Sequence, residues 1–140
     1  MSFYLDTSFL ISGVADEEKS AIARAWLKSG TDPTVIADFA TLEFDASVSR
    51  FVRTGRVTQD VARVMLARLD QMRASSATHV HTRNDYERAS TLIRDFTTKL
   101  AAPDALHLAS AINLGATLVT FDRRLAEAAQ ARGAKVLTPE

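Results

Sequence analysis

Short apolar segments alternate with stretches of helical periodicity along the whole chain. The short segments are rich in β-branched or aromatic side chains, which favour strands. Five strands are expected, at 3–5, 34–37, 79–82, 117–120 and 135–137. Helices are expected between them, at about 9–12, 16–29, 38–54, 58–74, 84–100, 103–114 and 123–132. This alternation, with strands apolar throughout, predicts one three-layer α/β/α domain over residues 1–140 around a central parallel sheet.

Capping signals mark several of the expected helix ends. Gly30 is expected as a left-handed residue after the first long helix, and Asp38 as the N-cap of the next. Asn84 and Glu87 have the spacing of a capping box. Pro103 suits the first position of its helix, where a missing N–H costs nothing.

Composition and charge exclude several classes of protein. The 140 residues include no cysteine, which excludes disulfides, thiolate zinc sites and cysteine nucleophiles. Lys plus Arg and Asp plus Glu each number 17, so the balanced charge argues against a general nucleic-acid coat protein. It leaves room for an enzyme that grips a few phosphates locally. No apolar run approaches the roughly 20 residues of a spanning helix, and residues 1–6 do not resemble a signal peptide. We therefore expect a cytoplasmic protein without membrane contact.

Two acids follow strands at the edge where parallel sheets bind their ligands. Asp6 comes directly after strand 3–5, and Asp122 comes directly after the apolar segment 118–121. Each has a structural alternative, because Asp often forms turns and caps helices. A cap oxygen can also face a ligand, so the two interpretations are compatible.

Two further acids are less distinctive. Asp104 lies in the first turn of a nearly all-apolar helix, where interaction with the helix dipole is the structural alternative. Glu43 lies in mid-helix, with Asp45 as a rival and a contact with Arg50 as its structural explanation. Carboxylates that converge at one edge repel each other, and a divalent cation relieves that repulsion. Oxygen ligands alone favour Mg²⁺ or Mn²⁺, which suit phosphodiester hydrolysis.

Four segments together resemble PIN domains. They are Tyr4-Leu5-Asp6-Thr7-Ser8, the helix with Glu43, the run Pro103-Asp104-Ala105-Leu106-His107-Leu108-Ala109 and the run Ala116-Thr117-Leu118-Val119-Thr120-Phe121-Asp122. The resemblance covers essentially the whole chain and extends to the VapC-type toxins of type II toxin–antitoxin pairs. It implies ribonuclease activity on RNA, Mg²⁺ or Mn²⁺ as cofactor, a homodimer and inhibition by a VapB-type antitoxin.

The resemblance also assigns functional residues. It maps the catalytic, metal-binding acids onto Asp6, Glu43, Asp104 and Asp122, which favours Glu43 over Asp45. Neighbouring hydroxyls and one basic residue are candidates for substrate binding or support of the acids: Thr7, Ser8, Thr120 and Arg50. His107 is expected to pack or to support the site rather than to act as a base. Many relatives have a further acid after the last one, whereas Arg123 and Arg124 stand here. This departure argues against a second metal ion, and it is expected to place positive charge near the substrate phosphates.

An inhibitor would need an apolar groove, and helices 16–29 and 38–54 offer residues for one. We expect some of the following six residues to line this groove, and the others to belong to the core: Ile22, Trp26, Leu27, Phe44, Val48 and Phe51.

Two other functions stay open at this point. A phosphotransfer enzyme or receiver-like signalling domain also places acids at strand ends. However, Ser8 stands where a haloacid-dehalogenase-like site needs a second Asp, and no strand-end Lys occurs late in the chain. A catalytically silent binding module with the PIN fold is the other alternative.

Overall fold

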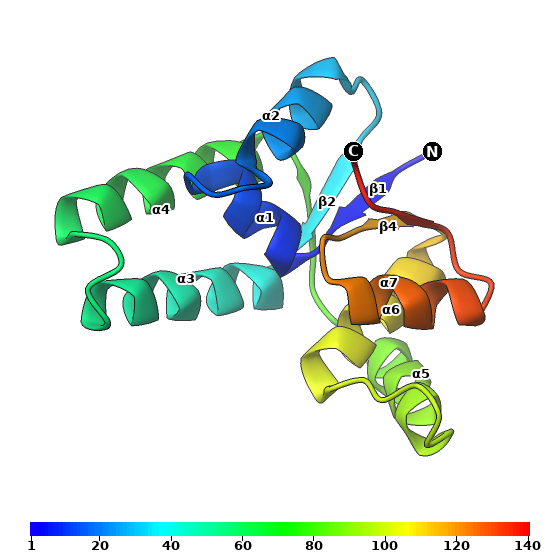
Figure 1. The fold of residues 1–140 in the computed structure, drawn as a ribbon. Helices are drawn as coiled ribbons and strands as arrows, with labels where there is room; N and C mark the ends of the chain where they lie inside the picture. The colour runs from blue at the N-terminus through cyan, green and yellow to red at the C-terminus, as the bar shows by residue number, and fades with distance from the viewer.

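The computed structural model describes residues 1–140 and contains a five-stranded sheet flanked by seven helices (Figure 1). The strands are β1 (Phe3–Leu5), β2 (Thr34–Ala37), β3 (Ala77–His79), β4 (Thr117–Val119) and β5 (Val136–Leu137). Their order across the sheet is β3-β2-β1-β4-β5, and every neighbouring pair is parallel. The predicted α/β architecture with a central parallel sheet is confirmed.

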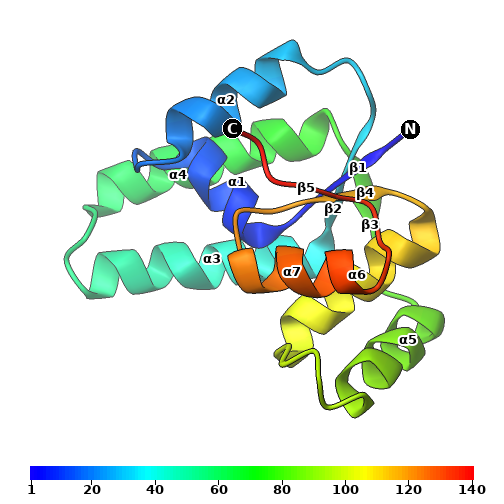
Figure 2. The same ribbon diagram turned by 45° about the vertical axis from the view of Figure 1, so that its right-hand side comes forward.

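The helices divide into two groups, one on each side of the sheet (Figures 1 and 2). They are α1 (Thr7–Val14), α2 (Ser20–Ser29), α3 (Asp38–Arg53), α4 (Gln59–Ala74), α5 (Arg83–Arg94), α6 (Ala102–Leu114) and α7 (Arg123–Ala131). The chain moves outward from β1 through β2 to β3, then returns past β1 to β4 and β5. Because crossovers between parallel strands are right-handed, this reversal puts α1 to α4 on one face and α5 to α7 on the other. None of the helices combines the length and apolar composition needed to span a bilayer.

The reversal creates a switch point between β1 and β4. The chain leaves β1 toward one face and leaves β4 toward the other, so the two connections diverge beyond the carboxyl ends of these strands. Such a divergence is where open parallel sheets bind ligands. Leu5 is paired with Val119, so Asp6 and Thr120 lie beside each other at this point.

The core fixes the elements that surround the switch point. Strand β4 is buried along its whole length, and residues 105–111 of α6 are all buried. Helix α6 is enclosed because it packs against α5, α7 and β4. The largest fully buried side chains include Tyr4, Phe9, Phe44 and Leu118. Burial of each such side chain stabilises the fold by about 1.5–3 kcal/mol.

Several predicted helix ends in the first half of the chain are wrong. Helix α2 begins at Ser20 rather than at residue 16, and Gly30 has an extended backbone with φ −80° and ψ 140°. Ala37 is the N-cap of α3, while Asp38 is its first residue and pairs with Arg73 at 3.6 Å. The carboxylate of Asp38 therefore serves an ion pair with α4 instead of a cap.

The junction after β3 also differs from the prediction. Strand β3 ends at His79. Thr82 and Asp85 form the capping box of α5, not Asn84 and Glu87. The hydroxyl of Thr82 accepts from the backbone N–H of Asp85 at 3.2 Å, and the Asp85 carboxylate accepts from the Thr82 N–H at 2.9 Å.

The same helix is shorter than expected. Helix α5 ends at Arg94, so Leu100 lies outside it. Phe96 and Lys99 have φ values of 64° and 55° in the left-handed region, which a continuing α-helix cannot accommodate. In the next helix, which begins at Ala102, Pro103 is the second residue rather than the first. This helix ends before Gly115, as expected, and Gly115 is a left-handed C-cap with φ 65°.

Candidate active site

Asp6 is a buried carboxylate at the centre of the switch point. Its Oδ2 accepts hydrogen bonds from Ser8 Oγ at 2.7 Å, from Thr120 Oγ1 at 2.8 Å and from the Ser8 backbone N–H at 3.3 Å. Asp6 is therefore the N-cap of α1, as the structural alternative held, and it also joins β1 to the segment after β4. No hydrogen bond engages its Oδ1, so that oxygen is available to a ligand.

Thr120 connects Asp6 with Asp122. The fully buried Thr120 hydroxyl donates to Asp6 and accepts from the backbone N–H of Asp122 at 3.0 Å. Asp122 caps α7 because its Oδ1 accepts from the Leu125 N–H at 3.0 Å. Both strand-end acids are thus held by local capping geometry, and each keeps a second carboxylate oxygen without a partner.

Glu43 reaches this region from the middle of α3. Its Oε1 accepts from Thr7 Oγ1 at 2.9 Å and is hydrogen-bonded to Nε2 of the fully buried His107. Burial raises the pKa of Glu43, but the bonds from His107 and Thr7 outweigh it and leave the pKa below its usual range.

The rival acid and the basic candidate on the same helix lie elsewhere. Asp45 is exposed, and the expected contact between Glu43 and Arg50 is not formed. Arg50 instead lies over the Phe51 ring, 5.9 Å from its centroid, and makes no hydrogen bond to any of the four acids.

Asp104 is the candidate acid whose pKa is raised by the charges of the other three. It lies half-buried in the first turn of α6 and accepts no hydrogen bond. Burial, followed by the negative charges of Asp6 and Asp122, raises its pKa from 3.8 to about 6, with a smaller contribution from Glu43. The negative charges of Asp6, Asp122 and Glu43 thus act on Asp104, although no three of the four acids have ligand atoms that all lie within 4.8 Å of one another. The candidate ligand atoms are carboxylate oxygens, which suit a hard cation such as Mg²⁺ or Mn²⁺.

The sequence did not indicate that His107, the buried hydrogen-bond partner of Glu43, belongs to a network of buried polar side chains. His107 Nδ1 lies 2.7 Å from the hydroxyl of Tyr4, which is also fully buried. Burial, and then the charges of Asp6 and Asp85, raise the pKa of Tyr4 well above its usual range, so the phenol keeps its proton. The pattern that could have revealed this pair is a polar residue at 107 on an otherwise apolar helix.

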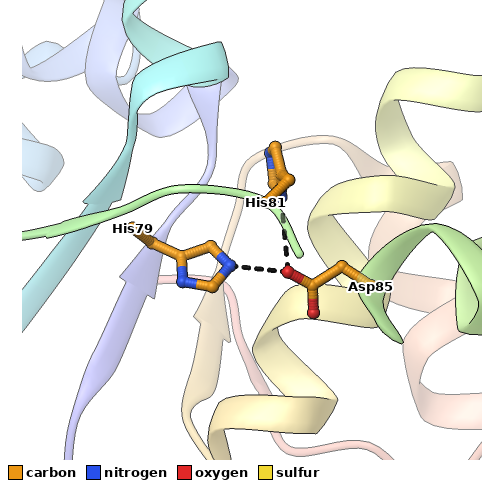
Figure 3. A group of neighbouring side chains, drawn as sticks. All are labelled: His79, His81 and Asp85. Atoms are coloured by element: carbon orange, nitrogen blue, oxygen red, sulfur yellow. Dashed lines mark hydrogen bonds and ion pairs between the residues drawn. The ribbon is translucent and has the colours of Figure 1, made fainter. Parts of the chain in front are cut away.

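A second group of potential ligands lies deeper, at the junction of β3 and α5 (Figure 3). His79, His81 and Asp85 offer ligand atoms that all lie within 4.8 Å of one another. The Asp85 oxygens are already occupied, since Oδ2 is bonded to His79 at 2.8 Å and Oδ1 accepts from Asn113 at 2.8 Å.

The charges in this group fit a structural role. Burial raises the pKa of Asp85, but its hydrogen bonds, led by that from the Thr82 backbone, hold it well below its usual range. Burial, and then the neighbouring histidines, lower the pKa of His81 to about 4. Both Asp85 oxygens are hydrogen-bonded and His81 Nδ1 pairs with Ser110, as in a structural junction, whereas the buried Nε2 of His81 has no partner.

The apolar groove differs from the one expected. A groove of about 590 Å³ lies between the end of α1, α3 and α4. Seven apolar residues line it together with acidic and basic residues, and the apolar ones are Val14, Ala15, Phe51, Val57, Val61, Val64 and Met65. Phe51 alone of the six predicted residues contributes.

The other five expected groove residues do not line it. Phe44 and Val48 are core residues, and Ile22 and Leu27 are partly buried. Trp26 packs edge-on against the rings of Phe3 and Phe9.

The family comparison agrees with this geometry. The PIN domain family model matches residues 3–131, and the chain belongs to this family. No curated protein matches it by sequence.

Solved structures share the fold across the whole chain. VapC20 of Mycobacterium tuberculosis, described as a toxin that cleaves the sarcin–ricin loop, has 18% identity and a TM-score of 0.74, with 98% of this chain and 99% of that one covered. VapBC2 of Rickettsia felis, bound to promoter DNA, has 16% identity and a TM-score of 0.73, with 100% of both chains covered. FitAcB of Neisseria gonorrhoeae has 18% identity and a TM-score of 0.72, with coverage of 98% and 97%. At these identities the likeness concerns the fold.

Proposed function

We propose that residues 1–140 act as one PIN domain with the activity of a metal-dependent endoribonuclease, the toxin of a toxin–antitoxin pair. Membership of the PIN family and the likeness of the fold to VapC20 support this function. The observation that carries it is the geometry at the switch point, where Thr120 joins Asp6 to Asp122 and Thr7, in the helix that Asp6 caps, donates to Glu43. The charges of these three acids also raise the pKa of Asp104. The folded chain therefore holds these negative charges near Asp104, and a bound divalent cation would relieve the repulsion between them.

The four acids would hold one Mg²⁺ or Mn²⁺. Asp6 Oδ1, Glu43 Oε2, Asp122 Oδ2 and both oxygens of Asp104 carry no hydrogen bond, so they are the ligand atoms we expect. When bound, such a cation polarises the phosphodiester and activates water for attack at neutral pH.

The chain's own residues orient this site. Ser8, Thr120 and Thr7 each donate to a carboxylate oxygen that the ligand does not need, which fixes the direction of the remaining oxygen. Arg124 follows Asp122, is exposed and forms no ion pair, so it is a candidate contact for a neighbouring phosphate of the RNA.

We further propose a VapB-type antitoxin as inhibitor, a homodimer as the assembled form and the cytoplasm as the compartment. Solved relatives include a toxin–antitoxin complex from Klebsiella pneumoniae with 20% identity, which supports an antitoxin partner. The groove beside Phe51 has an apolar floor and a charged rim, as an amphipathic segment requires.

An RNase assay with a matched pair of variants tests the proposal. The purified chain should cleave RNA in Mg²⁺ or Mn²⁺, lose activity in EDTA and regain it when the cation is restored. Glu43→Gln should lose at least about 100-fold in rate, because a ligand is neutralised. Asp45→Asn, two residues away and exposed, should cleave like the wild type.

Two results would oppose the proposal. Cleavage that survives EDTA would remove the metal from the mechanism. Absence of cleavage in every cation, with intact binding of RNA or antitoxin, would instead indicate a catalytically silent module. In cells, expression of the chain alone should slow growth, and co-expression of its antitoxin should restore it.

A further inference from the structure

A buried polar chain leads from the candidate site into the core. Glu43 Oε1 is hydrogen-bonded to His107 Nε2, and His107 Nδ1 lies 2.7 Å from the Tyr4 hydroxyl. Tyr4 and His107 have no exposed surface, whereas the Glu43 side chain is 26% exposed. The chain therefore has one end in the protein interior and the other at the acids.

The hydrogen on the imidazole ring is fixed by the two partners. A phenol has an ordinary pKa near 10, so Tyr4 carries its hydrogen at neutral pH and donates it to Nδ1. A neutral imidazole has one donor and one acceptor nitrogen. In a neutral ring whose Nδ1 accepts from Tyr4, the hydrogen lies on Nε2 and is donated to the Glu43 carboxylate.

Both donors to Glu43 bind the same carboxylate oxygen. Oε1 accepts from His107 and from Thr7, while Oε2 accepts from neither. Two donors from opposite elements, α1 and α6, fix the plane of the carboxylate. The free oxygen is thereby kept for a ligand.

We infer that His107 is a positioning residue that orients Glu43 toward the cation, and that Tyr4 fixes the tautomer in which it does so. This inference rests on the proposed function, because the cation is the ligand that Oε2 would bind. Metal sites in general depend on such outer partners, whose loss costs about 10–100-fold in metal affinity or activity.

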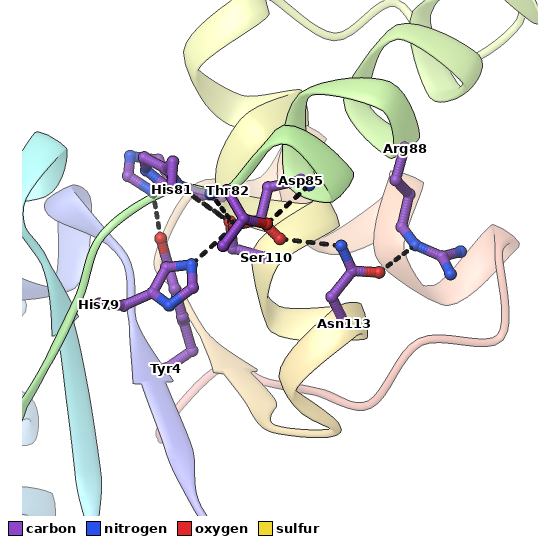
Figure 4. A network of polar contacts seen from close by, with 9 residues as sticks. Tyr4, His79, His81, Thr82, Asp85, Arg88, Ser110 and Asn113 are labelled. Atoms are coloured by element: carbon purple, nitrogen blue, oxygen red, sulfur yellow. Dashed lines mark hydrogen bonds and ion pairs between the residues drawn. The ribbon is translucent and has the colours of Figure 1, made fainter.

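The surroundings hold both rings in place. His107 packs against the rings of Tyr4, His81 and Phe39, with centroid distances of 5.7, 5.7 and 5.9 Å. Figure 4 shows Tyr4 beside the network of His79, His81, Ser110 and Asp85. Ser110 Oγ lies 2.7 Å from His81 Nδ1, and the Tyr4 ring lies edge-on to His79 with a centroid distance of 6.4 Å.

The alternative is that His107 only fills the core, and three variants separate the two roles. His107→Leu keeps an apolar filling but removes the donor to Glu43. His107→Gln restores an amide N–H at the reach of Nε2. Tyr4→Phe keeps the ring and removes the hydrogen that fixes the tautomer.

The readouts are Mn²⁺ affinity, measured by electron paramagnetic resonance without RNA, and RNA cleavage at saturating Mn²⁺. We expect His107→Leu to weaken Mn²⁺ binding at least about tenfold and His107→Gln to stay within about threefold of wild type. Tyr4→Phe should fall between them. ¹⁵N NMR of the metal-free wild type gives the tautomer without any variant, and we expect the hydrogen on Nε2 alone at neutral pH.

The outcomes distinguish failure of this inference from failure of the proposed function. If Glu43→Gln loses Mn²⁺ but folded His107→Leu binds it like wild type, the positioning role is overturned and the metal site stands. A ring hydrogen on Nδ1 overturns the role of Tyr4. If the wild type binds no Mn²⁺ at all, the proposed function fails, and the inference fails with it.

Discussion

Neutralising Asp104 should stabilise the metal-free protein. Asp104→Asn keeps the shape of the side chain and removes the charge that burial, Asp6 and Asp122 oppose. A rise in pKa from 3.8 to about 6 corresponds to about 3 kcal/mol of destabilisation when the group is ionised. Because Asp104 is half-buried, solvent screening reduces this to about 1–2 kcal/mol. For a chain of this size, the melting temperature should rise by about 3–6 °C.

The sign of the effect sets its pH dependence. The folded state binds a proton at Asp104 more tightly than the unfolded state, so the penalty is complete above the folded pKa near 6. It shrinks as the pH falls from about 6 toward 3.8 and is absent below that. The advantage of Asp104→Asn should therefore be largest at pH 7.5 and clearly smaller at pH 4.5.

Differential scanning calorimetry in EDTA at these two pH values measures the effect, with Asp45→Asn as the exposed control. The control should change stability by no more than about 0.5 kcal/mol. Added Mg²⁺ should raise the melting temperature of the wild type and raise that of Asp104→Asn much less. A lower melting temperature for Asp104→Asn, or an equal difference at both pH values, would refute the repulsion.

Three further substitutions test how the fold supports the site. Asp85→Ala should cost about 3 kcal/mol at neutral pH in urea unfolding, because the buried Asp85 carboxylate loses its hydrogen bonds with Thr82, His79 and Asn113. The lowered pKa of Asp85 means that its contribution fades as the pH falls through the acidic range. Gly115→Ala should cost about 1 kcal/mol, since φ at this C-cap is 65°, and an unchanged urea midpoint would contradict the strain. Asp6→Asn should keep its far-ultraviolet circular dichroism, because an amide oxygen can still accept from Ser8 and Thr120, yet it should lose Mn²⁺ binding; a large loss of stability would make the cap the main role of Asp6.

Four of the five strands were predictable because their signal is local. Each of these is a short run of apolar or β-branched residues, and β2 agrees with the expectation at both ends. Strand β3 was expected at 79–82 but spans Ala77–His79, so the two ranges share only His79. Strand order and helix ends were not predictable in the same way. Asp38 has the residue type of a cap, but Arg73 of a distant helix pairs with it. Thr82 and Asp85 form the capping box, since the preceding strand ends earlier than its apolar pattern suggested.

The candidate acids show the same contrast between local and distant signals. Asp6 and Asp122 could be proposed from their places after strands, because the sheet geometry determines where such residues lie. Glu43 came from the resemblance alone, since nothing on its own helix distinguishes it from Asp45. What distinguishes it in the structure is the pair of donors Thr7 and His107, which are 36 and 64 residues away in sequence. Contacts at such separations leave no periodic signal in one chain.

The central claim is that four acids hold one divalent cation. Crystals soaked in Mn²⁺ and measured near the manganese absorption edge test it directly, because the anomalous signal locates the ion independently of activity. We expect a strong peak among the carboxylates of Asp6, Glu43, Asp104 and Asp122, and no such peak in Asp104→Asn. A peak at His79, His81 and Asp85 instead, or none at the four acids in well-soaked crystals, would contradict it.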